Sequence, residues 1–110
     1  MALVTRTLTN SGEPLSLPDG NVLAGAVVIF ELVNEDRAIV DAWDGSSRIG
    51  GKVSAVTDIN GEFSISLWPN DRGSSTTYYL CRVEGVPDFS PVLGQVAESV
   101  GPLQWVDFAV

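Results

Sequence analysis

VSAVTDINGEFSISLW, residues 53–68 of this 110-residue chain, contains two runs of alternating apolar and polar residues on either side of a turn sequence. A third alternating run, TTYYLCRV at residues 76–83, follows a second break that contains Pro, Asn, Asp and Gly. Alternation with a period of two, bounded by such breaks, is typical of antiparallel strands joined by tight turns. These three runs predict a β-sheet protein.

The turn inside this stretch contains Asp58, Asn60 and Gly61. Glycine adopts a positive φ without the steric cost of a Cβ, and an Asp side chain in a turn accepts hydrogen bonds from backbone N–H groups two or three residues later. We therefore expect Asp58, Asn60 and Gly61 to be structural turn residues. A calcium loop of the EF-hand type needs further ligands, a downstream bidentate Glu and flanking helices, which the surrounding sequence lacks.

The whole chain predicts seven short strands. They are expected at residues 3–9, 26–33, 38–43, 52–57, 62–68, 76–84 and 103–110. Residues 26–33 form the most apolar run; a helix is the alternative there, but the short length and the β-branched residues favour a strand. We expect residues 38–43 to pair with this run as a hairpin. The segments 10–20, 44–51 and 85–101 are expected to be loops because they are rich in Gly, Pro, Ser or Asn.

Alternation also predicts which side chains face the core. The inward set is Val28, Phe30, Leu32, Phe63, Ile65, Leu67, Tyr79, Cys81 and Val83. Glu31 and Trp68 are expected on outward faces, and Phe89, Val92 and Leu93 are expected to cover the open end of the core. Two packed antiparallel sheets bury such a set economically, and a small closed barrel is the alternative.

Length and composition limit the class of protein. With 110 residues, of which 45% are hydrophobic, the chain is expected to form a single domain over residues 1–110. The net charge of −8 argues against nucleic acid and anionic membranes as partners, since both require clustered Lys and Arg. No apolar run reaches the length of a membrane helix, and the N-terminus lacks the pattern of a signal peptide, so we expect synthesis in a cytoplasm without export by that route.

The residue types available for catalysis are few. The chain has no His, which excludes Ser-His and Cys-His pairs, and its single Cys81 lies in an expected strand, where a buried inert thiol is the simplest interpretation. Neighbouring acids such as Asp41 and Asp44 would need a cleft to act as an acid/base pair. Gly45 to Gly51 is not followed by a helix that could receive a phosphate. We therefore assign no catalytic residue, no metal ligand and no cofactor, and expect a protein that is not an enzyme.

Aromatic residues are the best candidates for binding. Trp43 and Trp68 fall on outward positions of their strands, where they would provide a sugar-stacking platform or part of a protein interface, unless loops cover them. The final strand adds Trp105 and Phe108. The interface or binding candidates are Trp43, Trp68, Phe89, Val92, Leu93, Trp105 and Phe108.

Three segments resemble one known family. GNVLAGAVV at residues 20–28, TDINGEFS at residues 57–64 and the Tyr-x-Cys-x-Val run at residues 79–83 look like the carboxypeptidase-regulatory-like, or transthyretin-like, β-sandwich. The match departs from the family pattern at Val22, where Pro is usual, and at Cys81, where Leu is usual. About 28 residues separate the first two segments, which is longer than in simple modules. SLWPN at residues 66–70, with Arg72 and Gly73, resembles modules in tail-fibre and other virion proteins of tailed bacteriophages.

The resemblance covers roughly residues 20–84. It implies an all-β fold, a single seven-stranded immunoglobulin-like (transthyretin-like) antiparallel β-sandwich. It also implies a non-enzymatic structural component of a tailed-bacteriophage virion, made in the bacterial host cytoplasm: a tail-fibre or tail-attachment module that mediates subunit contacts. A capsid decoration protein and a glycan-binding adhesion module that uses exposed tryptophans are the alternatives.

The partners implied are other virion proteins, further copies of the chain in a homo-oligomer, and, for the adhesion alternative, a host surface glycan. Nucleic acid and membranes are not expected as partners. The terminal segments 1–9 and 103–110, together with the loop 85–101, are the candidates for subunit contacts, because they are apolar or rich in proline.

Overall fold

A computed structural model describes residues 3–85 and 89–110 of the chain. Within these residues the secondary structure is mostly β, with one 3-10 turn and one short helix. The elements are β1 (Arg6–Thr9), β2 (Val27–Val33), β3 (Ala42–Asp44), β4 (Ser47–Ile49), β5 (Lys52–Val56), β6 (Ser64–Leu67), η1 (Asn70–Arg72), β7 (Tyr78–Glu84), β8 (Val92–Gly94), β9 (Leu103–Gln104) and α1 (Trp105–Phe108). The all-β prediction is confirmed, and no helix among these residues is long and apolar enough to cross a membrane.

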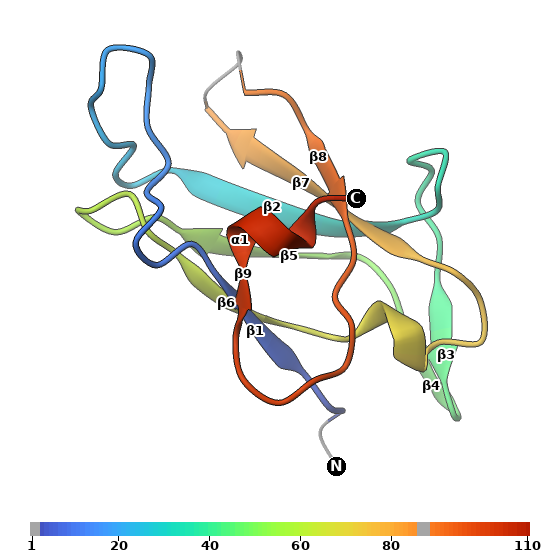
Figure 1. Cartoon of the computed structure of the whole chain (residues 1–110). Helices are drawn as coiled ribbons and strands as arrows, with labels where there is room; N and C mark the ends of the chain where they lie inside the picture. Colours follow the sequence, from blue (N-terminus) through green and yellow to red (C-terminus); the bar gives the residue numbers. More distant parts are fainter. Residues whose placement is uncertain (1–2, 86–88) are drawn as a thin grey trace.

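Two larger sheets lie on either side of the core (Figure 1). One sheet has the strand order β6-β1-β9, and the other has the order β5-β2-β7-β8. All pairs in these sheets are antiparallel except β1 with β9, which is parallel. The chain crosses from one sheet to the other between β5 and β6, through the turn at Asp58–Gly61.

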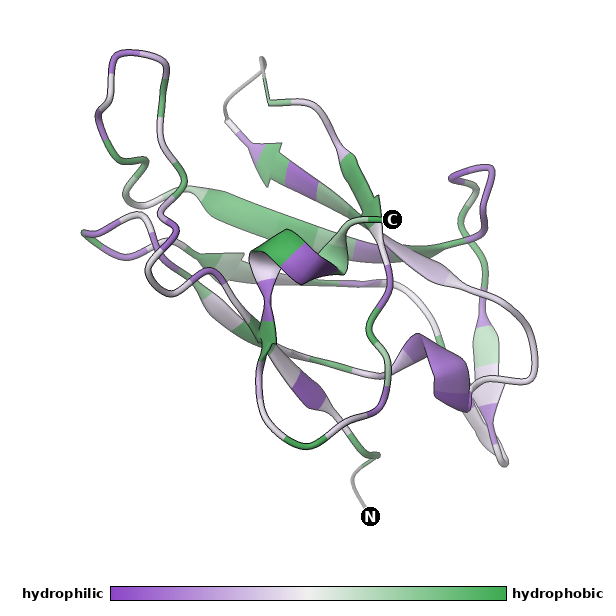
Figure 2. Cartoon of the chain, viewed as in Figure 1, coloured by the Kyte–Doolittle hydropathy of each residue, from purple (hydrophilic) through white to green (hydrophobic). Residues whose placement is uncertain are grey.

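Strand β2 lies in the middle of the four-stranded sheet and supplies much of the core. Val28, Phe30 and Leu32 are buried as expected, and Figure 2 shows how apolar this strand is compared with the loops around it. The Phe30 ring meets the Phe63 ring at 5.9 Å and the Phe108 ring at 5.8 Å between centroids. The contact with Phe108 is edge-to-face and that with Phe63 is tilted, and such aromatic pairs add to the free energy gained by burial.

Most expected inward positions in β7 and in the segment from Phe63 to the end of β6 are also confirmed, whereas Val83 is only half-buried. Phe63, Leu67, Tyr79 and Cys81 are buried, and Ile65 packs against them. The alternation predicts these positions because successive side chains of a strand point to opposite faces of the sheet.

The prediction that Trp68 faces outward is wrong, because this side chain is only 6% exposed. Strand β6 ends at Leu67, so the pleat no longer sets the direction of the next side chain. The indole turns inward and its Nε1 donates a hydrogen bond to Asp44 Oδ2 at 3.0 Å. The backbone carbonyl of Trp68 accepts a hydrogen bond from the Tyr79 hydroxyl at 2.6 Å, which holds the segment after β6 against β7.

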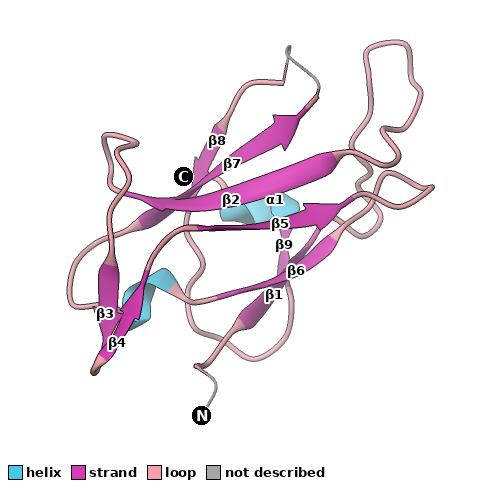
Figure 3. Cartoon of the chain, turned by 180° about the vertical axis from the view of Figure 1, so that it is seen from behind, coloured by secondary structure: helices cyan, strands magenta, loops and turns pink. Residues whose placement is uncertain are grey.

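The expected hairpin of residues 26–33 with residues 38–43 forms only at its closed end. A single bridge joins Val33 to Ile39, and the chain then diverges to form β3. Strand β3 pairs with β4, which lies inside the predicted loop 44–51, and the two strands form a separate hairpin (Figure 3). Gly45, at φ 62°, permits the tight turn between them.

The expected final strand is also shorter than predicted. Only Leu103–Gln104 is a strand, and the helical turn α1 follows. This turn directs Phe108 into the core and stacks it on Trp105 at 5.5 Å between ring centroids. In a straight strand these two side chains would point to opposite faces of the sheet, because they are three residues apart.

The predicted loop 85–101 contains β8, which pairs with β7. Val92 packs against the core, as expected, while Leu93 lies opposite Leu80 and is half-buried. Phe89 is half-buried. Residues 1–2 of the first terminal segment and residues 86–88 of this loop lie outside the described residues.

Candidate functional site

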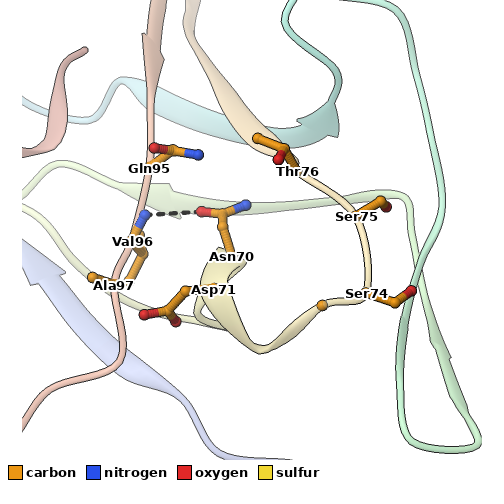
Figure 4. A pocket seen from close by; sticks show the side chains of 9 residues that line it. Asn70, Asp71, Ser74, Ser75, Thr76, Gln95, Val96 and Ala97 are labelled. Carbon is orange, nitrogen blue, oxygen red and sulfur yellow. Dashed lines mark hydrogen bonds between the residues drawn. The ribbon is translucent and has the colours of Figure 1, made fainter.

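A polar hollow of about 360 Å³ lies between η1, the approach to β7 and the segment after β8 (Figure 4). Its walls are mainly amide, hydroxyl and carboxylate side chains. The lining residues that carry polar side chains are Asn70, Asp71, Ser74, Ser75, Thr76 and Gln95.

Three of these six polar side chains, Asn70, Asp71 and Gln95, have hydrogen-bond partners within the protein. Asn70 Oδ1 accepts a hydrogen bond from the Val96 N–H at 2.8 Å, and its Nδ2 donates to Thr77 Oγ1 at 3.0 Å. Gln95 Nε2 donates to the Thr77 carbonyl at 3.0 Å. The Asp71 carboxylate accepts from the backbone N–H of Glu98. These bonds hold the segment after β8 against η1, so the hollow has a structural cause, and its exposed Ser and Thr hydroxyls remain at the rim.

A charged cluster lies beside this hollow. Arg72 Nε donates to Asp44 Oδ2 at 2.9 Å, and the other side of its guanidinium contacts Glu98. The hydrogen bond from Arg72, followed by that from the Trp68 indole, holds the pKa of Asp44 below its usual value. The two carboxylates in turn raise the pKa of Arg72. The cluster ties the β3–β4 hairpin to η1, and without such ties a two-stranded hairpin is only marginally stable.

This anchoring leaves Trp43 on the outer side of the hairpin. Ala42 is buried, and the alternation along β3 turns the next side chain, Trp43, outward, where it is 50% exposed. Arg48 lies opposite it on β4 and forms an ion pair with Asp41. The expected exposure of Trp43 is therefore confirmed. A platform built from Trp43 and Trp68 is not, because only the first of them reaches the surface.

The turn at Asp58–Gly61 has the predicted chemistry. Asp58 Oδ1 accepts hydrogen bonds from the N–H groups of Asn60 at 2.8 Å and Glu62 at 3.0 Å. Gly61 has a φ of 74°, a backbone conformation that residues with a Cβ adopt only at a steric cost. The described residues contain no group of three or more His, Cys, Asp or Glu side chains placed to hold a metal ion.

The most connected buried polar side chain was missed in the sequence. Asn10 is 0% exposed and binds the Asp58–Gly61 turn from the side. Its Nδ2 donates to the carbonyls of Gly61 at 3.0 Å and Glu13 at 3.2 Å, and its Oδ1 accepts from the Phe63 N–H at 2.6 Å. An Asn beside Ser and Gly indicates only the end of a strand. The neighbouring sequence does not reveal that its partners Gly61 and Phe63 lie more than 50 residues away.

Burial also explains the state of Cys81 and Tyr79. Desolvation raises the pKa of the Cys81 thiol to about 12, which keeps it protonated and unreactive at neutral pH. Burial also raises the pKa of Tyr79, whose neutral hydroxyl donates to the Trp68 carbonyl. Both groups are therefore parts of the core.

Five exposed aliphatic side chains lie on the segments at the two ends of the chain, one of them, Val110, beside β8. These segments meet in space, because β1 pairs with β9 and Arg6 donates hydrogen bonds to the carbonyls of Ala97 at 3.0 Å and Gly101 at 3.1 Å. The set that we call the terminal surface is Leu3, Val4, Val100, Val106 and Val110. Phe108 is buried and Trp105 half-buried beneath these segments, so these two candidates act in the core of the single chain.

In comparisons with known proteins, the chain matches no protein-family model and no curated protein sequence. The surfaces described above are therefore the basis for a functional proposal.

Proposed function

We propose that this chain is a non-enzymatic structural module of a tailed-bacteriophage virion, a tail-fibre or tail-attachment module that contacts other subunits through the terminal surface. The observation that carries the proposal is the exposure of five aliphatic side chains on segments joined by β1–β9 pairing and by Arg6. Exposed apolar side chains on segments that pair with one another are candidates for an interaction surface.

The strand arrangement supports the fold that the resemblance implies. A three-stranded sheet facing a four-stranded sheet agrees with such a sandwich, although the β3–β4 hairpin and the parallel β1–β9 pair depart from a purely antiparallel seven-stranded pattern. The segments that carry the resemblance are also close in space. Residues 27–28 lie in β2, residues 79–83 lie in the neighbouring β7, and residues 57–64 form the crossing between the two sheets. Such modules position surfaces for assembly, which agrees with the proposed role.

Self-association of the purified protein tests the proposal. Light scattering over a range of concentrations is expected to show a closed oligomer. Val106→Asp places a charge on the terminal surface and is expected to shift the protein towards monomer at the same concentration. Ile59→Asp is the matched control, because Ile59 is also exposed, at 83% against 65% for Val106, but lies in the turn between β5 and β6.

A wild-type protein that stays monomeric at every concentration would contradict the tail-fibre assignment and favour the capsid decoration alternative, in which the protein orders only on its particle. An oligomer that Val106→Asp leaves intact would show that the terminal surface is not the contact. In that case the exposed valines would have no assembly role.

The exposed Trp43 supports a glycan-binding module as the second candidate. Its indole face is open at the surface beside Arg48, and aromatic faces of this kind stack on the apolar faces of sugars. Binding of simple sugars, measured by calorimetry, is expected to disappear in Trp43→Ala and to persist in part in Trp43→Tyr. Sugar binding that survives Trp43→Ala, or no binding to any sugar tested, would remove this candidate.

A further inference from the structure

Strand β5 forms one edge of the four-stranded sheet and has a hydrogen-bonding neighbour on one side only, β2. The bonds at its two ends show which backbone groups face that neighbour. Leu32 N–H donates to the Gly51 carbonyl at 3.1 Å, and Thr57 N–H donates to the Ala26 carbonyl at 2.9 Å. In an antiparallel pair the direction of these groups alternates along the strand, so residues 51, 53, 55 and 57 face β2.

The N–H and C=O groups of Lys52, Ser54 and Val56 therefore point away from the sheet. None of the hydrogen bonds found among the described residues uses them. Natural edges are usually protected by proline, bulges or charged side chains, especially Lys. Strand β5 has no proline and an unbroken register with β2, and its one charge, Lys52, lies at its first residue and leaves the rest of the edge uncharged.

The side chains along this edge are also open. Val53 is 48% exposed and Val56 is 62% exposed. A shallow hollow of about 110 Å³ beside Val53 reaches Phe30 and Leu67, between the β5 and β6 edges of the two sheets. Figure 3 shows the two edges on the same side of the molecule. A strand added to β5 would cover apolar surface as well as satisfy backbone groups.

Charge along the edge selects the orientation of such a strand. Lys52 lies at one end of β5, and Asp58 and Glu62 follow its other end. Antiparallel pairing of two copies brings the basic end of one strand to the acidic end of the other, whereas parallel pairing brings like charges together. We propose that β5 is a dimerisation edge that pairs antiparallel with β5 of a second copy of this chain, about a two-fold axis at Ser54.

This register places Ser54 opposite Ser54 of the second copy and Lys52 opposite Val56, so that the unpaired backbone groups of the two edges meet. The arrangement is isologous, and it closes after two copies instead of propagating into a fibre. The inference rests on the proposed function in one respect, that the chain associates with further copies of itself. The terminal surface and the β5 edge are different surfaces, so Val106→Asp and Ser54→Lys test the two proposals separately.

Ser54→Lys tests the proposed edge. It places two ammonium groups side by side at the two-fold axis. The hydrogen bonds between β5 and β2 stay intact, because the backbone N–H and C=O groups of Ser54 point away from β2. Sedimentation velocity is expected to show a dimer dissociation constant about tenfold higher or more, without a lower melting temperature. Ser74→Lys, at another exposed serine in the rim of the polar hollow, is the matched control and is expected to dimerise like the wild type.

Cysteine cross-linking tests the register. Cα atoms of a directly opposed pair lie about 5.5 Å apart, within the range that a disulfide spans. Ser54→Cys is therefore expected to give a cross-linked dimer under mild oxidation. Val56→Cys is expected to give little, because its two copies would lie about 14 Å apart along the strands. The native Cys81 is buried and contributes no background.

Three outcomes would overturn the inference: a wild-type monomer at all concentrations, unchanged dimerisation in Ser54→Lys, or equal cross-linking of the two cysteine variants. An oligomer broken by Val106→Asp and not by Ser54→Lys would leave the proposed function standing without the β5 edge. An oligomer broken by Ser54→Lys and not by Val106→Asp would support the β5 edge as the contact and reject the terminal surface.

Discussion

Truncation of the buried Asn10 is expected to be one of the most destabilising changes to a polar residue in this protein. Asn10 joins the end of β1 to the connection between β5 and β6 through two hydrogen bonds, with Gly61 and Phe63, and donates a third to the Glu13 carbonyl. In Asn10→Ala the Phe63 N–H loses its acceptor in a buried position, which costs about 1–3 kcal/mol. The Gly61 carbonyl retains a hydrogen bond from the Leu15 N–H at 3.0 Å, so its loss is smaller.

Adding the unfilled space left by the side chain, we expect the free energy of unfolding to fall by about 3 kcal/mol. Urea unfolding followed by tryptophan fluorescence measures this change, and the dependence of the free energy on denaturant should stay the same. Asn60→Ala is the control, since Asn60 is exposed at the tip of the same turn; its effect is expected within about 0.5 kcal/mol. A loss below about 0.5 kcal/mol in Asn10→Ala would refute the reasoning that these buried bonds hold the turn in place.

Three further predictions concern packing, acid stability and thiol reactivity. Gly94→Ala puts a Cβ against the ring and carbonyl oxygen of Phe108, and thermal unfolding is expected to show a loss of about 1–3 kcal/mol; an unchanged melting temperature would contradict this close approach. The hydrogen bond from Arg72 lowers the pKa of Asp44, so it stabilises the folded state at pH values above the pKa that Asp44 has in the unfolded chain. This stabilisation is lost as the pH falls below about 4. The difference in urea midpoint between wild type and Asp44→Asn is therefore expected to shrink between pH 6 and about pH 2, and a constant difference would reject this linkage. Cys81 is expected to react with a thiol reagent at pH 8 only after unfolding, and rapid reaction of the native protein would contradict its burial.

Local patterns were sufficient for the positions inside strands. The period of two along β2, β6 and β7 identified the buried faces, including Phe30, Phe63 and Tyr79. The turn at Asp58–Gly61 was also predictable, because an Asp carboxylate and a Gly with positive φ act on residues only a few positions away. In these places the sequence neighbours are also the structural neighbours.

The candidate surfaces were only partly predictable. The exposure of Trp43 followed from alternation, and the terminal segments were identified by their apolar composition. The polar hollow at Asn70 was not anticipated, because its walls come from η1 and from a segment about 25 residues later, joined by hydrogen bonds that carry no local signal.

The sequence by itself determined an all-β chain, the inward faces of its central strands and the turn at Asp58–Gly61. Tertiary structure decided the residues at strand ends, where the pleat stops and contacts from distant segments take over. Trp68 points inward and bonds to Asp44, Phe108 lies in a helical turn and contacts Phe30, and β3 pairs with β4 instead of β2. The first two changes place an aromatic ring against residues far along the chain, and the free energy of those contacts exceeds the local preference for an extended strand. The third is a tight local hairpin, which the contacts of Asp44 with Trp68 and Arg72 hold in place.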